Sequence, residues 1–547
     1  MIITKFVSPL EKVFRENEPR DTLIDRVAYS NESLCFQLCL TTTQTGRLYL
    51  KTESEINDHI EICELKYVPA LMADYVEKDD YRIFTERTST YYPDLLEPLG
   101  SRFIVTEGYW TTLWVTIKPG LSPGNYSIRF ITGDYEYCDV LSDDIFDFSV
   151  CDIALERCDI PVSCWMYYDC IAAAHRAPLF SEKFYDILDN YFITAVENGI
   201  NTVFVPLFAQ RIPKKNSKNM QLIDIRKIGG RYSFDFSGLN RFIDHAMRCG
   251  FSNFEFTHIA STKEGKFCPR ITADDGQGKY LLFGEKDSAQ SPEYHLFLKE
   301  FFPRLFDYLK EKQISENCYF HIFDEPGQRT AEAYEALGSI MRECLPQGKL
   351  IDAVNDFCFS EMNILDYPVV GTNNVSPFIE SNKNIWVYYC CDQSGQYLSN
   401  RFFNFTLLRT RVIGLQLYLN DVKGFLHWAY NDWHDMNTYQ VIEPRFVSDG
   451  GGVLPAGDTF LVYPGDKQAD VSIRLKAFAE GIKDYRTLKT LENKMGRKSV
   501  LSILRKYGFD GFCKYTHDEN TFVKFWIFVR ELLADKAADG LMYAGEN

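Results

Sequence analysis

The chain has 547 residues, 46% of them hydrophobic and 25% charged, so it is long enough to bury a large core in more than one domain. Its 42 Phe, 33 Tyr and 7 Trp exclude a mainly disordered chain, because they supply ample apolar surface to bury. The formal net charge of −17 makes nucleic acid a poor candidate partner, since an acidic surface repels a phosphate backbone.

The sequence also bears on location. It contains no uninterrupted apolar run of about 18 residues, which predicts that no segment spans a membrane. The N-terminus, MIITKFVSPLEKVF, lacks the apolar region and small-residue cleavage site of a signal peptide. The 16 Cys form no C-x-x-C pair and no zinc-type cluster. We therefore expect a cytoplasmic protein with reduced, buried thiols; a redox or thiol-nucleophile enzyme is the less favoured alternative.

Residues 1–152 have the pattern of an all-β domain. Apolar and polar residues alternate over 113–117 and again over 126–130, with the turn pairs Pro119-Gly120 and Pro123-Gly124 between them. Alternation with period two predicts antiparallel strands with one buried face. A further strand is expected at 47–51, and a β-sandwich is the architecture that such strands favour.

From about residue 158 the pattern changes to short apolar runs that alternate with helical periodicity. Strands are predicted at 162–168, 202–207, 253–259, 318–324, 350–354, 366–371, 385–390 and 424–430. Helices are predicted around 184–196, 239–247, 294–309, 331–344 and 401–419, and a long loop follows 259. Eight such units predict a (β/α)8 TIM-like barrel over 153–466. Residues 467–547 are expected to form helices packed on the barrel.

The strongest local feature is the stretch HIFDEPG at 321–327. An apolar strand ends in the adjacent carboxylates of Asp324 and Glu325, and Pro-Gly then breaks it. In a barrel of this type the chemistry lies where strands end. A protonated carboxyl beside an ionised one can protonate a leaving group and stabilise a cation. The alternative is an exposed acidic turn that precedes the helix at residue 331.

Aromatic and polar side chains are expected to converge on the same rim. Flat rings stack on the C–H face of a sugar, and carboxylates and amides bond its hydroxyls. Candidates for substrate binding are Trp165, Asp169, His258, Asn355, Tyr388, Trp428, Tyr430 and Trp433. Simple barrel filling is the alternative for the rings, a core or supporting histidine for His258, and a loop turn for Asn355.

Other chemistries find no support in the sequence. With nine His and no H-E-x-x-H motif, it predicts no metal site, and we expect no cofactor. A Walker loop and a G-x-G-x-x-G motif after a strand are missing from the sequence. The letters G-x-S-x-G occur at 120–124, but they stand in the turn predicted between two strands and not at the strand-to-helix elbow of a hydrolase.

Seven stretches, in this order, resemble glycoside hydrolase family 123, whose catalytic module is also described as domain of unknown function 4091. The resemblance covers residues 161–488. Its marks are WMYYDCIAAAHR (165–176), NGINTVFVP (198–206), NFEFTHI (253–259), FDEPG (323–327), GFLHWAYNDW (424–433), DTFLVYPG (458–465) and SIRLKAFAEGIKDYRTL (472–488). His427 departs from the aromatic residue expected there in many relatives.

The resemblance implies an exo-acting β-N-acetylgalactosaminidase that retains configuration through substrate assistance and acts on an oligosaccharide or glycoconjugate. The family's Asp-Glu pair falls on Asp324 and Glu325. Glu325 would be the general acid and then the base for water, and Asp324 would hold the acetamido N–H and stabilise an oxazolinium-like intermediate. The substrate's own carbonyl oxygen would attack C1, so the enzyme needs no nucleophile.

Two alternatives stay open. A glycosidase of the same fold that acts on a sugar without an acetamido group would need a separate carboxylate nucleophile, for which Asp169 and Asp432 are the candidates. A non-catalytic glycan-binding protein on a barrel scaffold is the other, and the intact acidic pair makes it the less favoured. Nothing in the sequence indicates an oligomeric state.

Overall fold

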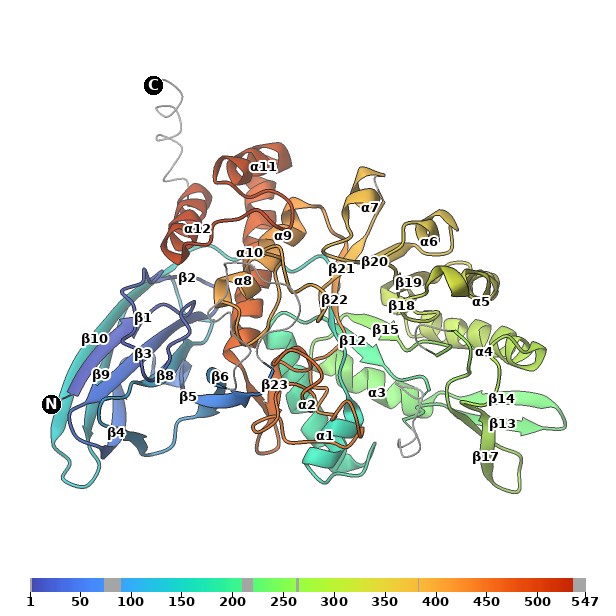
Figure 1. Cartoon of the computed structure of the whole chain (residues 1–547), viewed down its shortest axis with the longest axis horizontal. Coiled ribbons are helices and arrows are strands. Elements are labelled where there is room, and N and C mark those ends of the chain that lie inside the picture. Colours follow the sequence, from blue (N-terminus) through green and yellow to red (C-terminus); the bar gives the residue numbers. More distant parts are fainter. Residues whose placement is uncertain (1, 73–89, 209–219, 262–264, 382, 535–547) are drawn as a thin grey trace.

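The computed structural model describes residues 2–72, 90–208, 220–261, 265–381 and 383–534. An N-terminal β-rich part and a closed parallel barrel lie side by side, and the last helices pack between them (Figure 1). This confirms the expected α/β class. The exact domain limits stay predictions, and the end of the third predicted segment, 535–547, lies outside the described residues.

Two five-stranded sheets form the N-terminal part. The inner sheet has the strand order β1 (Ile2–Val7), β3 (Leu34–Thr42), β8 (Thr111–Ile117), β5 (Ile60–Ala70) and β6 (Thr90–Pro98). The outer sheet has the order β2 (Val27–Tyr29), β10 (Val140–Cys151), β9 (Gly124–Asp134), β4 (Gly46–Glu53) and β7 (Phe103–Val105). A dry core lies between them, where the rings of Phe36 and Phe146 stack with centroids 3.7 Å apart.

The strands on either side of the two Pro-Gly turns do not pair with each other. β8 lies in the inner sheet and β9 in the outer sheet, so the connection crosses the sandwich. The expectation of one buried face is wrong for β8. Leu113 and Val115 point into the sandwich core, whereas Trp114 is buried in the hydrophobic core shared with the barrel. The inner sheet is covered on both sides, which removes the polar face that alternation predicts.

The central part is a closed barrel of eight parallel strands, as predicted. In barrel order they are β11 (Val162–Cys164), β12 (Thr202–Val205), β15 (Asn253–Phe256), β18 (Cys318–Phe320), β19 (Lys349–Ala353), β20 (Tyr367–Gly371), β21 (Trp386–Tyr388) and β22 (Gly424–His427). Closure is made by β11 against β22, where Val162 pairs with Phe425. All eight carboxyl ends therefore meet at one rim.

Most strands are shorter than the apolar runs that predicted them. The first run, 162–168, holds only three strand residues, and helix α1 (Tyr168–Ala174) begins inside it. The same holds for β18, which ends at Phe320 although Ile322 and Phe323 are fully buried. The first residues of the rim loops are buried as well, so a run of apolar residues extends past the last residue that pairs with a neighbouring strand.

Helices connect the strands at most of the predicted places. They are α2 (Glu182–Glu197), α3 (Ser237–Arg248), α4 (Pro292–Glu311), α5 (Ala331–Cys344), α6 (Cys358–Glu361), α7 (Ser376–Glu380), α8 (Leu407–Arg411) and α9 (Ile413–Leu419). Side-chain caps fix several N-termini: Ser181 accepts from the Phe184 N–H, and Ser291 from that of Tyr294. The helix expected at 401–419 begins only at Leu407, where Thr406 caps it.

A small additional sheet was not predicted: two of its strands lie in the loop expected after 259, and the other two lie between 207 and 239. Its order is β14 (Arg231–Asp235), β13 (Asp224–Ile228), β16 (Ile271–Asp274) and β17 (Lys279–Phe283). The first hairpin turns at Gly229 and Gly230, which both have positive φ, at 59° and 82°. A Gly-Gly pair between two short runs is a hairpin signal, so the sequence did contain the evidence for it.

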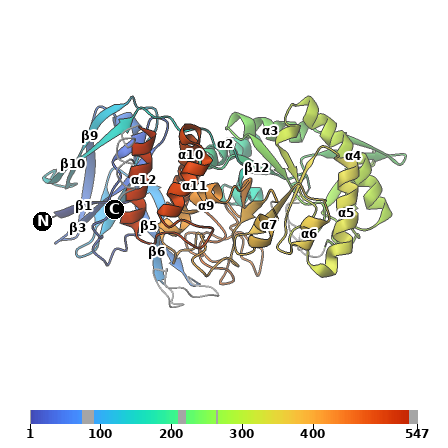
Figure 2. The ribbon, with the colours of Figure 1, turned by 90° about the horizontal axis from the view of Figure 1, so that it is seen from above.

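The last helices are α10 (Ile473–Met495), α11 (Arg497–Lys506) and α12 (Glu519–Leu533). Seen from above, α10 lies between the sandwich and the barrel, and α12 lies next to it over the sandwich strands (Figure 2). The fully buried Arg474 at the start of α10 binds both carboxylate oxygens of Asp94 on β6, at 2.7 and 2.9 Å. It also donates to the carbonyl oxygens of Arg401, Gly457 and Phe460. One guanidinium thus joins all three parts of the chain.

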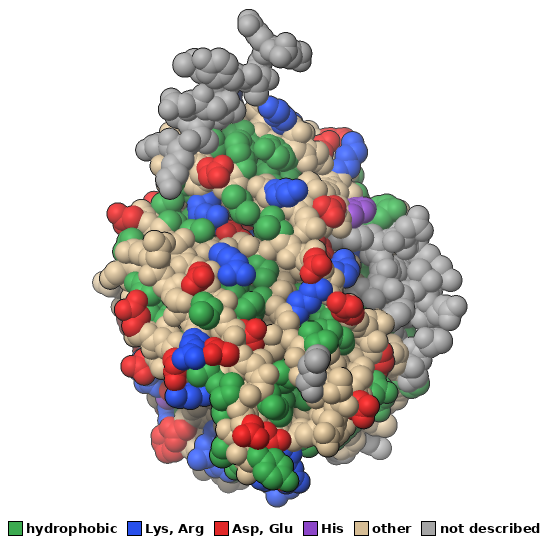
Figure 3. Space-filling model, turned by 90° about the vertical axis from the view of Figure 1, so that its left-hand side faces the viewer, with side chains coloured by type: hydrophobic (Ala, Val, Ile, Leu, Met, Phe, Trp, Pro, Cys, Tyr) green, Lys and Arg blue, Asp and Glu red, His purple; other side chains and the backbone are tan. Residues whose placement is uncertain are grey.

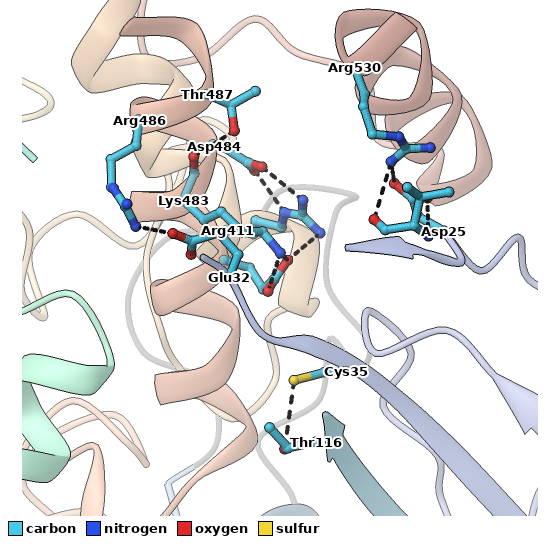
Figure 4. A network of polar contacts seen from close by, with 12 residues as sticks. Asp25, Glu32, Cys35, Thr116, Arg411, Lys483, Asp484, Arg486, Thr487 and Arg530 are labelled. Carbon is cyan, nitrogen blue, oxygen red and sulfur yellow. Dashed lines mark hydrogen bonds and ion pairs between the residues drawn. The ribbon is translucent and has the colours of Figure 1, made fainter. Parts of the chain in front are cut away.

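A second group of ion pairs lies on the same interface. Arg411 binds the Asp484 carboxylate at 2.7 and 2.8 Å, Arg486 pairs with Glu32 and Arg530 with Asp25 (Figure 4). The first pair joins α10 to helix α8 of the barrel, whereas the other two join α10 and α12 to the N-terminal part.

The surface of the sandwich end mixes charges of both signs with scattered apolar side chains (Figure 3). All 16 Cys lie among the described residues as free thiols. None of the helices in the described ranges is long and apolar enough to cross a membrane.

Candidate active site

The barrel brings six of the candidate residues and the acidic pair to one rim. Asp324 and Glu325 follow β18, and Tyr388 is the last residue of β21. The others follow β11, β15, β19 and β22 within a few residues: Trp165, Asp169, His258, Asn355 and Trp428. Strand ends that are far apart in the sequence therefore face a common space.

The acidic pair stands on a tightly held segment. The carbonyl oxygen of Ile322 accepts from the backbone N–H groups of Ile259 and Ala260, at 3.0 and 3.2 Å. The N–H of Glu325 donates to the Ala353 carbonyl at 3.1 Å. Asp324 and Glu325 are both half-buried.

Glu325 has a strained backbone. Its φ is +50°, in the left-handed region that a residue with a Cβ adopts at a cost of about 1–2 kcal/mol. Strain of this kind persists where the surroundings fix it, and it clusters at functional sites. The conformation directs the side chain toward the seventh strand, where the Tyr388 hydroxyl donates to Glu325 Oε1 at 3.2 Å.

The hydroxyl of Tyr388 is fixed from the other side by Asn355. The Asn355 amide donates to it at 2.7 Å, and Asn355 Oδ1 accepts from the Gly371 N–H at 3.0 Å. A Cβ on Gly371 would lie 2.8 Å from Asn373 Oδ1 and 3.0 Å from Asn355 Oδ1, so a larger residue there would push the Asn355 amide out of its position. Burial and the negative charge of Glu325 raise the pKa of Tyr388, which keeps the phenol neutral as a donor.

A charged group that the sequence analysis left without a role lies below the acidic pair. His321 donates through Nε2 to Glu255 and through Nδ1 to Asp352, at 2.7 and 2.8 Å, and all three side chains are buried. Burial alone would disfavour the imidazolium, but these hydrogen bonds and negative charges raise the pKa of His321 to about 10. The sequence did contain a signal for this group, because Glu255 and Asp352 each stand inside an apolar stretch that was predicted to be a strand.

Trp165 and His258 lie directly against this group. The indole of Trp165 stacks on Phe204, with centroids 4.6 Å apart, and donates to Glu255 Oε1 at 2.7 Å. The ring of His258 lies 4.4 Å from that of His321. Burial, and then the charge of His321, lower the pKa of His258 well below its usual value, so its imidazole is neutral.

A second imidazole between two carboxylates stands elsewhere on the rim. His434 contacts Asp432 through Nδ1 at 2.7 Å and Asp169 through Nε2 at 3.2 Å. Burial opposes its charge, but the hydrogen bonds that it donates to Asp169 and Asp432 raise the pKa of His434 to about 12. Asp432 is fully buried, whereas Asp169 is half-buried.

The remaining aromatic candidates differ in exposure. Trp428 is half-buried, but Tyr430 and Trp433 have 0% and 1% of their surface exposed. The Trp433 indole donates to the Val462 carbonyl at 3.0 Å, as a core residue does. His427 is also fully buried, with Nε2 3.5 Å from Asp458 Oδ1, so it does not form part of an exposed sugar platform.

Two groups of described residues have metal-ligand character. In each group, His258–His321–Asp352 and Asp169–Cys170–His434, the possible ligand atoms lie within 4.8 Å of one another. Both ring nitrogens of His321 and of His434 already contact carboxylates, so a metal would have to displace one of these contacts. We therefore describe both groups as hydrogen-bonded networks of an imidazole and two carboxylates.

Comparison with known proteins shows the family of the chain. A family model described as "Glycoside hydrolase 123, catalytic domain" matches residues 165–491. A family 123 glycoside hydrolase from Clostridium perfringens is similar over 100% of both chains, with 16% identity and a TM-score of 0.73.

A xyloglucanase from Bacteroides ovatus also aligns, over 84% of this chain and 98% of its own. At 8% identity and a TM-score of 0.31, this similarity is too weak to support a conclusion about the chain. No curated protein matches the chain. Since the family model spans more than half of the sequence and contains the acidic pair and its rim, the chain belongs to glycoside hydrolase family 123 and is a glycoside hydrolase.

Proposed function

We propose that the protein is an exo-acting β-N-acetylgalactosaminidase that retains configuration by substrate assistance. The observation that carries the proposal is the adjacent Asp324-Glu325 pair, half-buried at the rim, with Glu325 held by Tyr388. Carboxylates that are neighbours in the sequence suit a reaction whose nucleophile belongs to the substrate, because such a reaction needs no second carboxylate across the sugar.

The reaction proceeds in two steps. In the first, Glu325 gives its proton to the glycosidic oxygen, the C1–O bond breaks, and the acetamido carbonyl oxygen bonds to C1. Asp324 accepts a hydrogen bond from the acetamido N–H and stabilises the resulting oxazolinium ion. In the second step, Glu325 takes a proton from a water molecule while the water oxygen bonds to C1. The bond between C1 and the acetamido oxygen then breaks, which opens the oxazolinium ring and restores the acetamido group. Two inversions at C1 give net retention.

The contacts of Tyr388 fit this cycle. Its hydroxyl is a neutral donor to Glu325 Oε1, and it receives a hydrogen bond from Asn355. That donor stabilises the carboxylate form of Glu325, which must exist between the two proton transfers. Asn355 thereby acts on the acid through Tyr388 instead of contacting the sugar.

Trp165, His258 and Trp428 are the proposed contacts to the sugar itself. Each lies at a strand end on the rim, and flat rings suit a pyranose face. Trp428 is half-buried, and Trp165 and His258 keep 8% and 9% of their surface exposed. Tyr430 and Trp433 are too deeply buried to be used in this proposal.

A separate carboxylate nucleophile is the less favoured mechanism. Asp432 is fully buried, and both it and Asp169 bind the His434 imidazolium. A carboxylate in an ion pair with a buried cation is a weak nucleophile.

The similar Clostridium perfringens protein is described as acting on glycolipid glycans, which supports a glycoconjugate as substrate. The cytoplasmic location stays a prediction.

A panel of chromogenic aryl glycosides tests the proposal. We expect turnover of the β-N-acetylgalactosaminide, and none by Glu325→Gln. A thiazoline mimic of the oxazoline should inhibit, and Asp324→Asn should be severely impaired. Full activity of Asp324→Asn, or covalent trapping by a 2-fluoro sugar, would contradict the assisted mechanism. Binding without turnover across the panel would indicate a glycan-binding protein.

A further inference from the structure

Three buried charged residues cross three neighbouring strands of the barrel beneath the acidic pair. Glu255 lies on β15, His321 follows β18, and Asp352 lies on β19. The exposed fractions of the three are 0%, 1% and 0%. The His321 ring spans the gap between the two acids, at 2.7 and 2.8 Å. We call these three residues the Glu-His-Asp array.

One end of the array holds an aromatic ring at the rim. Glu255 Oε1 accepts from the Trp165 indole at 2.7 Å as well as from His321, and Oε2 accepts from the Ser163 hydroxyl. Phe204 covers one face of that indole at 4.6 Å. The hydrogen bond and the stacking contact together leave Trp165 a single orientation.

The other end holds the backbone that leads to the acidic pair. Asp352 Oδ1 accepts from His321, while Oδ2 accepts from the Ile322 N–H at 2.9 Å and from the Tyr334 hydroxyl at 3.0 Å. Ile322 stands two residues before Asp324. One side chain thus fixes the strand end from which both catalytic carboxylates project.

Stability alone does not explain the array. Apolar residues of similar size would fill the barrel without the cost of desolvating charges, which often exceeds the gain from their attraction. What a charged, hydrogen-bonded network supplies in addition is a fixed geometry. Catalytic groups need such precision, since a displacement of about 1 Å can cost about 10²-fold in rate.

We propose that Glu255, His321 and Asp352 are positioning residues that hold the Trp165 ring and the Asp324–Glu325 segment in one fixed relation. Glu255 acts on sugar binding through Trp165, and Asp352 acts on the chemical step through the Ile322 backbone. His321 couples the two ends. This inference rests on the proposed function, in which Trp165 contacts the sugar and Glu325 is the acid.

Steady-state kinetics separate the two ends. We expect Glu255→Ala to raise KM about 10-fold with kcat nearly unchanged, and Glu255→Gln, which still accepts from Trp165, to recover most of that loss. Asp352→Asn should lower kcat by about 10-fold or more with little change in KM. The matched control is Asp484→Asn, an equally buried acid on α10, which should lower thermal stability but leave both constants of the folded enzyme unchanged.

Two kinetic results would contradict the positioning roles of these residues. A purely structural array would make Glu255→Ala and Asp352→Asn lower stability as Asp484→Asn does, with KM and kcat intact, and that result would overturn it. Equal losses in kcat from both ends, with no change in KM, would overturn the division of roles.

Nuclear magnetic resonance of the full-length protein tests the geometry without any substrate. With labelled Trp and His, the Trp165 indole N–H resonance, assigned through Trp165→Phe, should move upfield in Glu255→Ala, and His321 should stay an imidazolium at pH 8 in the wild type. An unmoved Trp165 resonance or a neutral His321 would overturn the array. If the wild type cleaves no aryl glycoside, the proposed function fails on that result, while these spectra still decide the positioning.

Discussion

The barrel rim and the sandwich–barrel interface both bury charged side chains, but they use them differently. At the interface, Arg474 donates to Asp94 and to three backbone carbonyls. At the rim, a chain of buried hydrogen bonds ends beside two half-buried acids, Asp324 and Glu325. The interface network connects only buried groups, whereas the rim network leads to two acids that are half-buried.

The comparison separates two uses of buried charge. A closed network such as Arg474–Asp94 fixes the relative position of two domains. An array that leads to half-exposed acids fixes the position of reacting groups. Substitutions at the interface should therefore change stability and leave the rate of the folded enzyme intact, whereas substitutions at the rim should change the rate of the folded enzyme, whatever they do to stability.

The largest effect is expected at Glu325. Glu325→Gln removes the transferable proton but keeps the size of the side chain and its contact with Tyr388, so kcat should fall by about 10²–10⁴-fold. The melting temperature should stay near that of the wild type, since the residue is half-buried and not in the core. Hydrolysis of the aryl glycoside and a thermal melt measure both quantities; retained activity would remove Glu325 from the acid role.

The second-largest effect is expected at the interface between the sandwich and the barrel. Asp94→Ala leaves the Arg474 guanidinium buried without its acid, and we expect a loss of about 3–5 kcal/mol in the free energy of unfolding. Denaturant unfolding measures it. The double variant Asp94→Leu, Arg474→Met should recover much of the loss, because it removes the uncompensated charge. A single variant as stable as the wild type would show that the interface does not depend on this pair.

A smaller effect is expected at Tyr388. Tyr388→Phe removes the hydroxyl that donates to Glu325, and loss of a hydrogen bond to a charged group corresponds to about 1.5–3 kcal/mol, or about 10–100-fold in kcat. The matched control is Tyr463→Phe, which removes the hydroxyl that donates to Asp94 at the interface. We expect the control to have a lower melting temperature and an unchanged kcat. A control that loses kcat, together with a Tyr388→Phe variant that loses only stability, would contradict the distinction between the rim and the interface.

The smallest expected effect is a dependence of stability on pH. The pKa of His321 is raised in the folded state to about 10, above the value of about 6.5 for an unfolded histidine. Its stabilising contribution is therefore complete below about pH 6.5 and declines as the pH rises through 10. The difference in unfolding free energy between wild type and His321→Gln should shrink by at least about 1 kcal/mol from pH 6.5 to pH 10. A constant difference would show that His321 is not charged in the folded protein.

The sequence predicted the barrel well because its eight strands are short, buried apolar runs with helices between them. It also located the acidic pair, since Asp324 and Glu325 interrupt such a run where the strand ends. The hairpin at Gly229 and Gly230 was missed although its turn signal was present. β8 was assigned one buried face because local alternation does not show what covers the outside of a sheet.

The supporting residues of the site could not be predicted in the same way. Glu255 and Asp352 are single charges inside apolar strands, and only the closed barrel shows that both meet His321. Conversely, Tyr430 and Trp433 have the residue type expected of a sugar platform, but the structure buries both. Residue type and strand position identify candidates, whereas burial depends on loops that pack across the rim from distant segments.

The central claim is that the substrate's acetamido group forms the bond to C1 while Asp324 and Glu325 assist. The most direct test is the wild-type kcat/KM for aryl β-N-acylgalactosaminides whose acetyl methyl carries zero to three fluorine atoms. Fluorine withdraws electron density from the carbonyl oxygen, so we predict a steep fall in kcat/KM with each added fluorine. Rates that do not change along the series would contradict the account.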